Sequence, residues 1–224
     1  MARALPALAA VLAVLVVALG LALWTPWRSE KPVDRPLVRL DVDLGADAAF
    51  PSAIPSMGSS IAISPDGTRL VYLSGTPPRL FTRRLDQPKA TELPGTRGAV
   101  VPFFSPDGQW VGFGASGKVN KISVEGGAVV PLGEVGSFAG ASWAEDGSIF
   151  VSDFGKGLLQ FPAAGGAPTI VAPMVGETAL VIPQLLPGGK AILSPACTLG
   201  GADNCNIEVL TLADGRRKIL APPR

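Results

Sequence analysis

The chain has 224 residues, with 19 lysines and arginines, 18 aspartates and glutamates, two cysteines and no histidine. Because residues 28–224 are neutral overall and cannot offset a run of phosphates, the charge balance argues against a nucleic-acid partner. The lack of histidine excludes histidine-based triads and metal sites, and two cysteines cannot complete a four-ligand zinc site, so we expect no metal and no cofactor.

The first predicted element is a transmembrane helix. Residues 4–27 carry no charge, and residues 5–24 form a continuous apolar stretch rich in Leu, Val and Ala. A helix of this length spans about 30 Å, the thickness of the hydrocarbon core of a bilayer. Trp24 and Trp27 stand where an interfacial aromatic belt is expected. The sequence predicts a membrane anchor over residues 1–27, and a signal peptide cleaved near Ala18-Leu19-Gly20 is the alternative.

Residues 28–57 are predicted to be a linker with one strand. Over residues 37–44, apolar side chains at Val38, Leu40, Val42 and Leu44 alternate with other residues. A period of two is typical of a strand with one buried face. This strand has the pattern of an N-terminal strand that completes the last sheet of a repeat protein.

Residues 58–224 contain a repeated turn. Its last glycines, Gly67, Gly108, Gly147 and Gly189, are separated by 41, 39 and 42 residues. Proline presets φ, aspartate bonds to nearby backbone N–H groups, and glycine accepts a positive φ, so this composition favours a tight turn. We therefore assign structural roles to the turn residues Asp66, Gly67, Asp107, Gly108, Asp146, Gly147, Gly188 and Gly189. The four turns read Ser64-Pro65-Asp66-Gly67, Ser105-Pro106-Asp107-Gly108, Ala144-Glu145-Asp146-Gly147 and Leu186-Pro187-Gly188-Gly189.

Each period holds four short strand-like runs. In the second period these are residues 100–104, 110–114, 118–124 and 128–132. Four strands in about 40 residues, repeated, are typical of the blades of a β-propeller. A β-sandwich is the alternative, although it need not repeat its turns in register. The predicted fold is all-β, with four-stranded repeats over about 58–98, 99–138, 139–178 and 179–224.

The repeat resembles a known family. The Ser-Pro-Asp-Gly turn followed by an apolar strand is similar to the TolB-like, WD-like propeller repeat of bacterial periplasmic proteins. Residues 80–86, 103–110 and 121–127 resemble the extracytoplasmic part of acidobacterial-type serine/threonine protein kinases, in which a kinase domain precedes one transmembrane helix and a six-bladed propeller. The likeness covers residues 4–224, and it implies that the four repeats are part of a six-bladed ring. Because the sequence contains neither six repeats nor a kinase domain before Leu5, the resemblance also implies a fragment of a longer protein.

The resemblance also implies a location. It places the chain in the inner membrane as a single-pass protein, with the propeller in the periplasm. The distribution of basic residues indicates the opposite orientation, with the propeller in the cytoplasm. One basic residue, Arg3, precedes the span, and four follow it: Arg28, Lys31, Arg35 and Arg39. We give the family topology precedence over this local charge count.

Two segments match kinase motifs and are interpreted as hairpins. Residues 112–119 fit the glycine-loop pattern, and Asp153-Phe154-Gly155 fits the magnesium-binding tripeptide. Too few residues separate them for the remaining kinase elements, and the chain has no histidine for the catalytic loop. Both occupy the same position in successive repeats, which favours turns. We predict no catalytic residue in this chain.

Cys197 and Cys205 flank an insertion in the fourth repeat. The segment from the first turn to the second turn takes 25 residues there and 18 in each of the two repeats before it. A lengthened hairpin loop closed by a Cys197–Cys205 disulfide is the favoured interpretation, and two separate thiols are the alternative. A disulfide implies an oxidising compartment, in agreement with the family topology.

These observations predict a membrane-anchored extracytoplasmic propeller that acts as a sensor or interaction module, the ligand-binding part of a receptor-type kinase. Loops at one face or the central channel would bind a protein, a peptide or a small molecule. Two alternatives remain: a periplasmic TolB-like propeller that binds envelope proteins, and a propeller that gates a prolyl-oligopeptidase-type hydrolase.

Overall fold

The computed structural model describes residues 59–162, 164–198 and 205–221, and these form strands and turns without a helix. The predicted anchor and the predicted strand at residues 37–44 lie outside this part of the chain. Within the described residues, no helix is long and apolar enough to cross a membrane. The expectation of an all-β fold is therefore confirmed for the region of the repeats.

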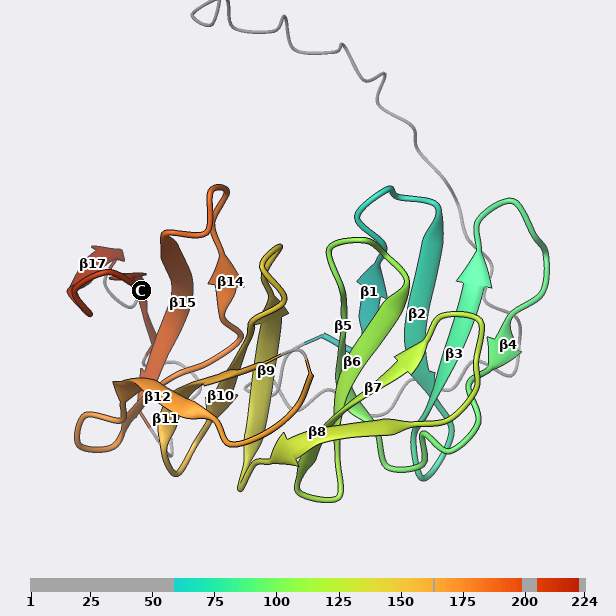
Figure 1. Cartoon of the computed structure of the whole chain (residues 1–224), viewed down its shortest axis with the longest axis horizontal. Helices are drawn as coiled ribbons and strands as arrows, with labels where there is room; N and C mark the ends of the chain where they lie inside the picture. The colour runs from blue at the N-terminus through green and yellow to red at the C-terminus, as the bar shows by residue number, and fades with distance from the viewer. Residues whose placement is uncertain (1–58, 163, 199–204, 222–224) are drawn as a thin grey trace, which may run out of the picture. The chain divides into compact units, whose positions relative to one another are not determined.

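The strands form four consecutive antiparallel sheets, coloured from cyan to red in Figure 1. The first contains β1 (Ile61–Ile63), β2 (Arg69–Ser74), β3 (Arg79–Arg84) and β4 (Thr91–Glu92). The second contains β5 (Val100–Phe104), β6 (Trp110–Ala115), β7 (Lys118–Ser123) and β8 (Val130–Glu134). The third contains β9 (Phe138–Trp143), β10 (Ile149–Asp153), β11 (Gly157–Phe161) and β12 (Thr169–Pro173). Each sheet follows sequence order, as expected for a propeller blade.

The fourth sheet contains a divided first strand. β13 (Thr178–Leu180) and β14 (Gln184–Leu185) both pair with β15 (Ala191–Thr198), which continues to β16 (Cys205–Thr211) and β17 (Arg217–Ala221). The sequence predicted a single strand here. The division falls at Ile182, whose φ of 48° is incompatible with extended backbone. Val101 and Gly140 have positive φ at the same distance from their own turns, so the irregularity belongs to the repeat.

The core lies between neighbouring sheets. One apolar cluster joins the first and second sheets through residues such as Leu80 and Phe113, and a second joins the second and third through Phe103 and Phe161. A third joins the third and fourth through Phe150 and Ile192. The inner strands contact one another in turn, β1 with β5, β5 with β9 and β9 with β14. The described residues thus form four packed sheets with their first strands side by side.

Two glycines of β6 make room for aromatic rings between sheets. A β-carbon at Gly112 would lie 2.1 Å from the Phe103 ring, and one at Gly114 would lie 2.5 Å from the Phe138 ring. The two rings stack on each other with centroids 6.4 Å apart. The glycines that imitate a kinase glycine loop are therefore required by packing at the interface of the second and third sheets.

Cys197 and Cys205 form a disulfide in the structure. They form the last register pair of the β15–β16 ladder, and this hairpin is the longest among the described strands. The bond therefore closes the segment that the sequence identified as an insertion.

Replacing Gly112 with alanine is expected to lower the free energy of unfolding by about 1–3 kcal/mol, because the new methyl group must displace the Phe103 ring. Denaturant unfolding of the full chain in detergent, followed by tryptophan fluorescence, measures this. The control is Gly155→Ala, where the β-carbon would lie 3.4 Å from Asp153 Oδ1, an ordinary contact. Equal stability of the two variants would contradict the packing role of Gly112.

Protein isolated from the cell envelope without reductant is expected to contain the Cys197–Cys205 bond. Closing this short loop stabilises the fold by about 2–3 kcal/mol in a chain-entropy model. Peptide mass analysis after alkylation detects the linked pair directly, and reduction followed by alkylation serves as the control. Alkylation of both cysteines without prior reduction would rule out the bond.

Candidate functional site

The repeated turns share one backbone geometry. In each, the N–H of the last glycine donates to the carbonyl three residues earlier: Gly67 to Ser64, Gly108 to Ser105, Gly147 to Ala144 and Gly189 to Leu186, at 2.9–3.0 Å. All four glycines have positive φ. The turns join the inner strand of each sheet to its second strand, so they lie on the same face of the array.

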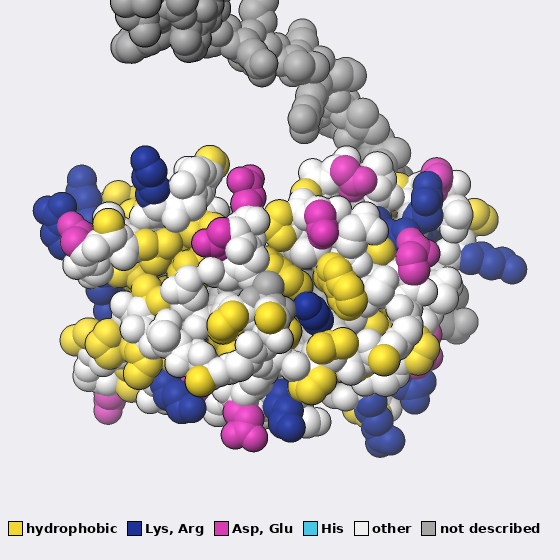
Figure 2. Space-filling view, viewed as in Figure 1, with side chains coloured by type: hydrophobic (Ala, Val, Ile, Leu, Met, Phe, Trp, Pro, Cys, Tyr) yellow, Lys and Arg dark blue, Asp and Glu magenta, His cyan; other side chains and the backbone are white. Residues whose placement is uncertain are grey.

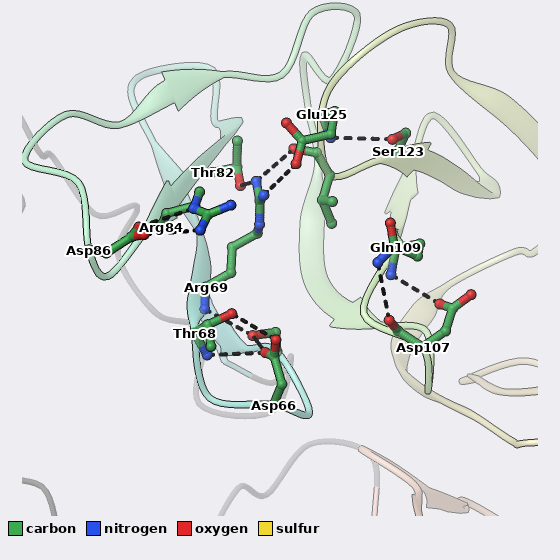
Figure 3. Close-up of polar contacts among 12 residues, drawn as sticks. Asp66, Thr68, Arg69, Thr82, Arg84, Asp86, Asp107, Gln109, Ser123 and Glu125 are labelled. Carbon is green, nitrogen blue, oxygen red and sulfur yellow. Dashed lines mark hydrogen bonds and ion pairs between the residues drawn. The ribbon is translucent and has the colours of Figure 1, made fainter.

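In the first two turns, the aspartate is held by a serine hydroxyl. Ser64 Oγ donates to Asp66 Oδ1 at 2.5 Å, and the backbone N–H and the hydroxyl of Thr68 donate to the same carboxylate at 3.1 and 2.8 Å. The second turn repeats this, since Ser105 Oγ and the Gln109 N–H donate to Asp107. Figure 3 shows these carboxylates facing the backbone of their own turns. They are bound within the turn, which supports a structural role.

These hydrogen bonds stabilise the ionised carboxylates. They lower the pKa of Asp66 to about 2, with the Ser64 hydroxyl as the largest cause and the Thr68 hydroxyl next. The pKa of Asp107 is lowered as well, mainly by the Ser105 hydroxyl and then by the Gln109 N–H.

The third turn differs in composition and partners. Ala144 stands where the others have serine, and Glu145 stands where they have proline. Asp146 Oδ1 accepts a hydrogen bond from the Ser148 N–H at 2.8 Å, and its other oxygen accepts none from the described residues. Both Glu145 and Asp146 are exposed. This turn therefore presents two adjacent carboxylates to solvent, and its aspartate keeps the backbone hydrogen bond but lacks the serine hydroxyl.

The third turn borders an open groove of about 950 Å³, which lies mainly between the third and fourth sheets and also contacts Pro65, Phe104 and Pro106 of the first two. Its lining runs from the inner turns to the outer strand β12. The apolar lining residues of the third and fourth sheets include Trp143, Phe150, Ile170, Val171, Leu185 and Leu212. In Figure 2, apolar side chains gather in the hollow at the upper left, and acidic side chains and a Lys or Arg side chain stand at its edge. The groove has the size of a ligand site, and its lining combines apolar and polar residues.

The charge of the groove has one sign. Its lining includes Glu145 and Asp146, and no lysine or arginine of the described residues. Gln160, also in the lining, donates to the Ser148 hydroxyl at 2.9 Å, next to the N–H that holds Asp146. The position of the Asp146 carboxylate is therefore fixed by neighbouring residues of the same sheet.

Asp153 of the kinase-like tripeptide does not line the groove. Asp153 is buried, and its carboxylate accepts hydrogen bonds from the N–H groups of Gly136 and Gly155 at 2.8 and 2.7 Å. It thereby fixes the hairpin that resembles the kinase tripeptide. Among the described residues, no three of the His, Cys, Asp and Glu side chains come together as a possible metal site.

The groove was not predicted from the sequence, and Glu145 was assigned no role. Asp146 was treated as equivalent to the other turn aspartates. The available signal was the change from Ser-Pro to Ala-Glu in the third turn, which removes the hydroxyl that occupies the carboxylate elsewhere.

Comparisons with known proteins identify the fold. No protein-family model and no curated protein matches the chain. Solved structures with a similar fold include TolB from Acinetobacter baumannii, with 19% identity and a TM-score of 0.60, over 72% of this chain and 43% of that one. A putative TolB from Agrobacterium tumefaciens has 12% identity and a TM-score of 0.63, over 74% and 66%. A structure of a nidogen/laminin complex has 14% identity and a TM-score of 0.59, over 73% and 64%.

These similarities define the class of protein. The described residues have a TolB-like β-propeller fold, as the sequence resemblance implied. The chain spans less than two thirds of the length of each of these three structures. The more specific resemblance to kinase-associated propellers stays a prediction.

The depressed pKa of Asp66 has a measurable consequence. Because the unfolded carboxyl titrates near pH 4, the folded form binds fewer protons between about pH 4 and pH 2. The stability from this carboxylate is complete above that window and is lost as the pH falls through about 2. Carboxyl NMR titration should show Asp66 titrating near 2, and Ser64→Ala should raise its pKa. Titration of Asp66 at its ordinary value in the unsubstituted protein would contradict the hydrogen-bonded turn.

Proposed function

We propose that this chain is a membrane-anchored, extracytoplasmic propeller that recognises another protein or a peptide as part of a receptor-type serine/threonine kinase. Its mechanism is binding, without bond-making chemistry. Residues 5–24 anchor the propeller, and the face with the repeated turns presents the binding surface. The propeller would transmit occupancy of this surface across the membrane to a kinase domain.

The observation that carries the proposal is the open groove in a TolB-like propeller, which combines an apolar wall with two carboxylates. Exposed apolar side chains beside a polar rim are typical of interaction sites. The neighbour solved as a nidogen/laminin complex supports the same use of the fold, since that structure contains a propeller together with another protein.

The anchored topology rests on the sequence of residues 1–57, which combines a charge-free span with interfacial tryptophans. A periplasmic TolB-like protein released by signal cleavage is the competing form. The two differ in whether the mature protein keeps residues 5–24, so the mass of the purified protein distinguishes them.

Alkaline phosphatase fused after Arg224 should be active and β-galactosidase at the same position inactive, because only the former folds in the periplasm. Deleting residues 5–24 should reverse both activities. The fusion protein should also stay in the membrane during carbonate extraction. The mass of its N-terminal part should show that residues 5–24 are retained. An active β-galactosidase fusion would refute the extracytoplasmic location, and a shortened, soluble product would favour the cleaved form.

A further inference from the structure

We propose that the groove between the third and fourth sheets binds an extended segment of another protein in which lysine or arginine alternates with apolar side chains. This inference deepens the proposed function, because it names the chemistry of the partner at one site. It rests on three properties of the groove: its apolar walls, its two carboxylates and the departure of its turn from the repeat.

The apolar wall of the groove is the partly exposed edge of the core. Phe150 belongs to the core between the third and fourth sheets, and Val171, Leu185 and Leu212 pack against that core while lining the groove. Ile170 on β12 is 59% exposed. An exposed isoleucine on an edge strand favours unwanted association, so a protein that presents one beside an open groove gains from having it covered.

The carboxylates determine the charge of the occupant. Glu145 and Asp146 are exposed beside the apolar wall, and the lining offers no described cation to neutralise them. In the two Ser-Pro-Asp-Gly turns the aspartate is bound to its own serine. Among the four turns, only the third combines a second acid with the loss of that serine, and both of its acids line the groove. A lysine or arginine of the partner would pair with these oxygens.

The shape determines the form of the occupant. The lining continues from the inner turns, where Leu186 and Pro187 lie, to Thr169, Ile170 and Val171 on the outer strand. A long, open groove of this kind fits an extended chain better than a compact small molecule. Alternating side chains of an extended segment point to opposite sides, which places apolar groups toward the wall and cations toward the turn.

The test measures binding of fluorescent ten-residue peptides to the full chain in micelles of a non-ionic detergent, with empty micelles as background. One peptide alternates lysine with valine and leucine. A second carries glutamate in place of lysine, and a third carries serine in place of the apolar residues. We expect saturable binding of the first peptide alone, weakening as salt is added.

Two variants locate the site. Glu145→Gln combined with Asp146→Asn should weaken binding about tenfold, as expected for the loss of two exposed ion pairs. Ile170→Arg should abolish binding, because it places a cation in the groove. The matched controls are Glu134→Gln, an exposed acid outside the groove, and Ile219→Arg, which replaces an isoleucine that is 57% exposed on the outer strand β17. Both controls should bind as the unsubstituted chain does.

Several results would overturn the inference. Equal binding of the glutamate peptide would contradict recognition of a cation by the two carboxylates. Equal effects of Ile170→Arg and Ile219→Arg would contradict binding in the groove. Self-association that Ile170→Arg abolishes would identify a second copy as the occupant. Peptide binding that appears only after deletion of residues 28–44 would identify that segment of the chain itself, which contains both basic and apolar residues, as the occupant.

The proposed function can survive the failure of this inference. A photoreactive amino acid placed at Ile219 in cells could cross-link to an envelope protein while one placed at Ile170 does not, which would show binding at another surface. Conversely, groove binding in micelles together with an active cytoplasmic reporter would keep the site and reject the extracytoplasmic receptor.

Discussion

The packing of each sheet against the next is the interaction on which the rest of the structure depends. The apolar clusters of the described residues each span two neighbouring sheets. The second sheet illustrates the constraint, because β6 turns Val111 and Phe113 toward the first sheet, while Gly112 and Gly114 accept the rings of Phe103 and Phe138. In this strand, large side chains pack on one face, and glycines leave room for aromatic rings on the other.

Polar contacts reinforce the same junctions. Arg69 of β2 donates to Thr82 of its own sheet and to the Val124 carbonyl of the second, and pairs with Glu125 (Figure 3). Ile182 donates to the Ala139 carbonyl at 2.8 Å, where the positive φ of Gly140 lets the backbones approach closely. The groove opens where apolar contact between the third and fourth sheets ends, so its apolar wall is a continuation of the core.

The period and the turn chemistry predicted the sheets, because proline presets φ, aspartate bonds to the nearby backbone and glycine accepts a positive φ. Three strands of the second sheet fall within one residue of their predicted bounds, and β8 ends two residues later. The division at Ile182 could not be predicted, since nothing in an isoleucine indicates a positive φ imposed by a neighbouring sheet. The groove could not be predicted either, because Ile170 and Leu185 belong to different sheets and line one groove only when the two sheets pack.

The disulfide affects what the fourth sheet can accommodate. Cys197 and Cys205 close the ladder of β15 and β16 at its last register pair, so the covalent bond holds the ends of these two strands together. A foreign peptide, such as an epitope or a small fluorogen-binding tag, could be inserted between Thr198 and Cys205 without loosening the strands beneath it. The hairpin thus provides a position at which a label can be added to the chain.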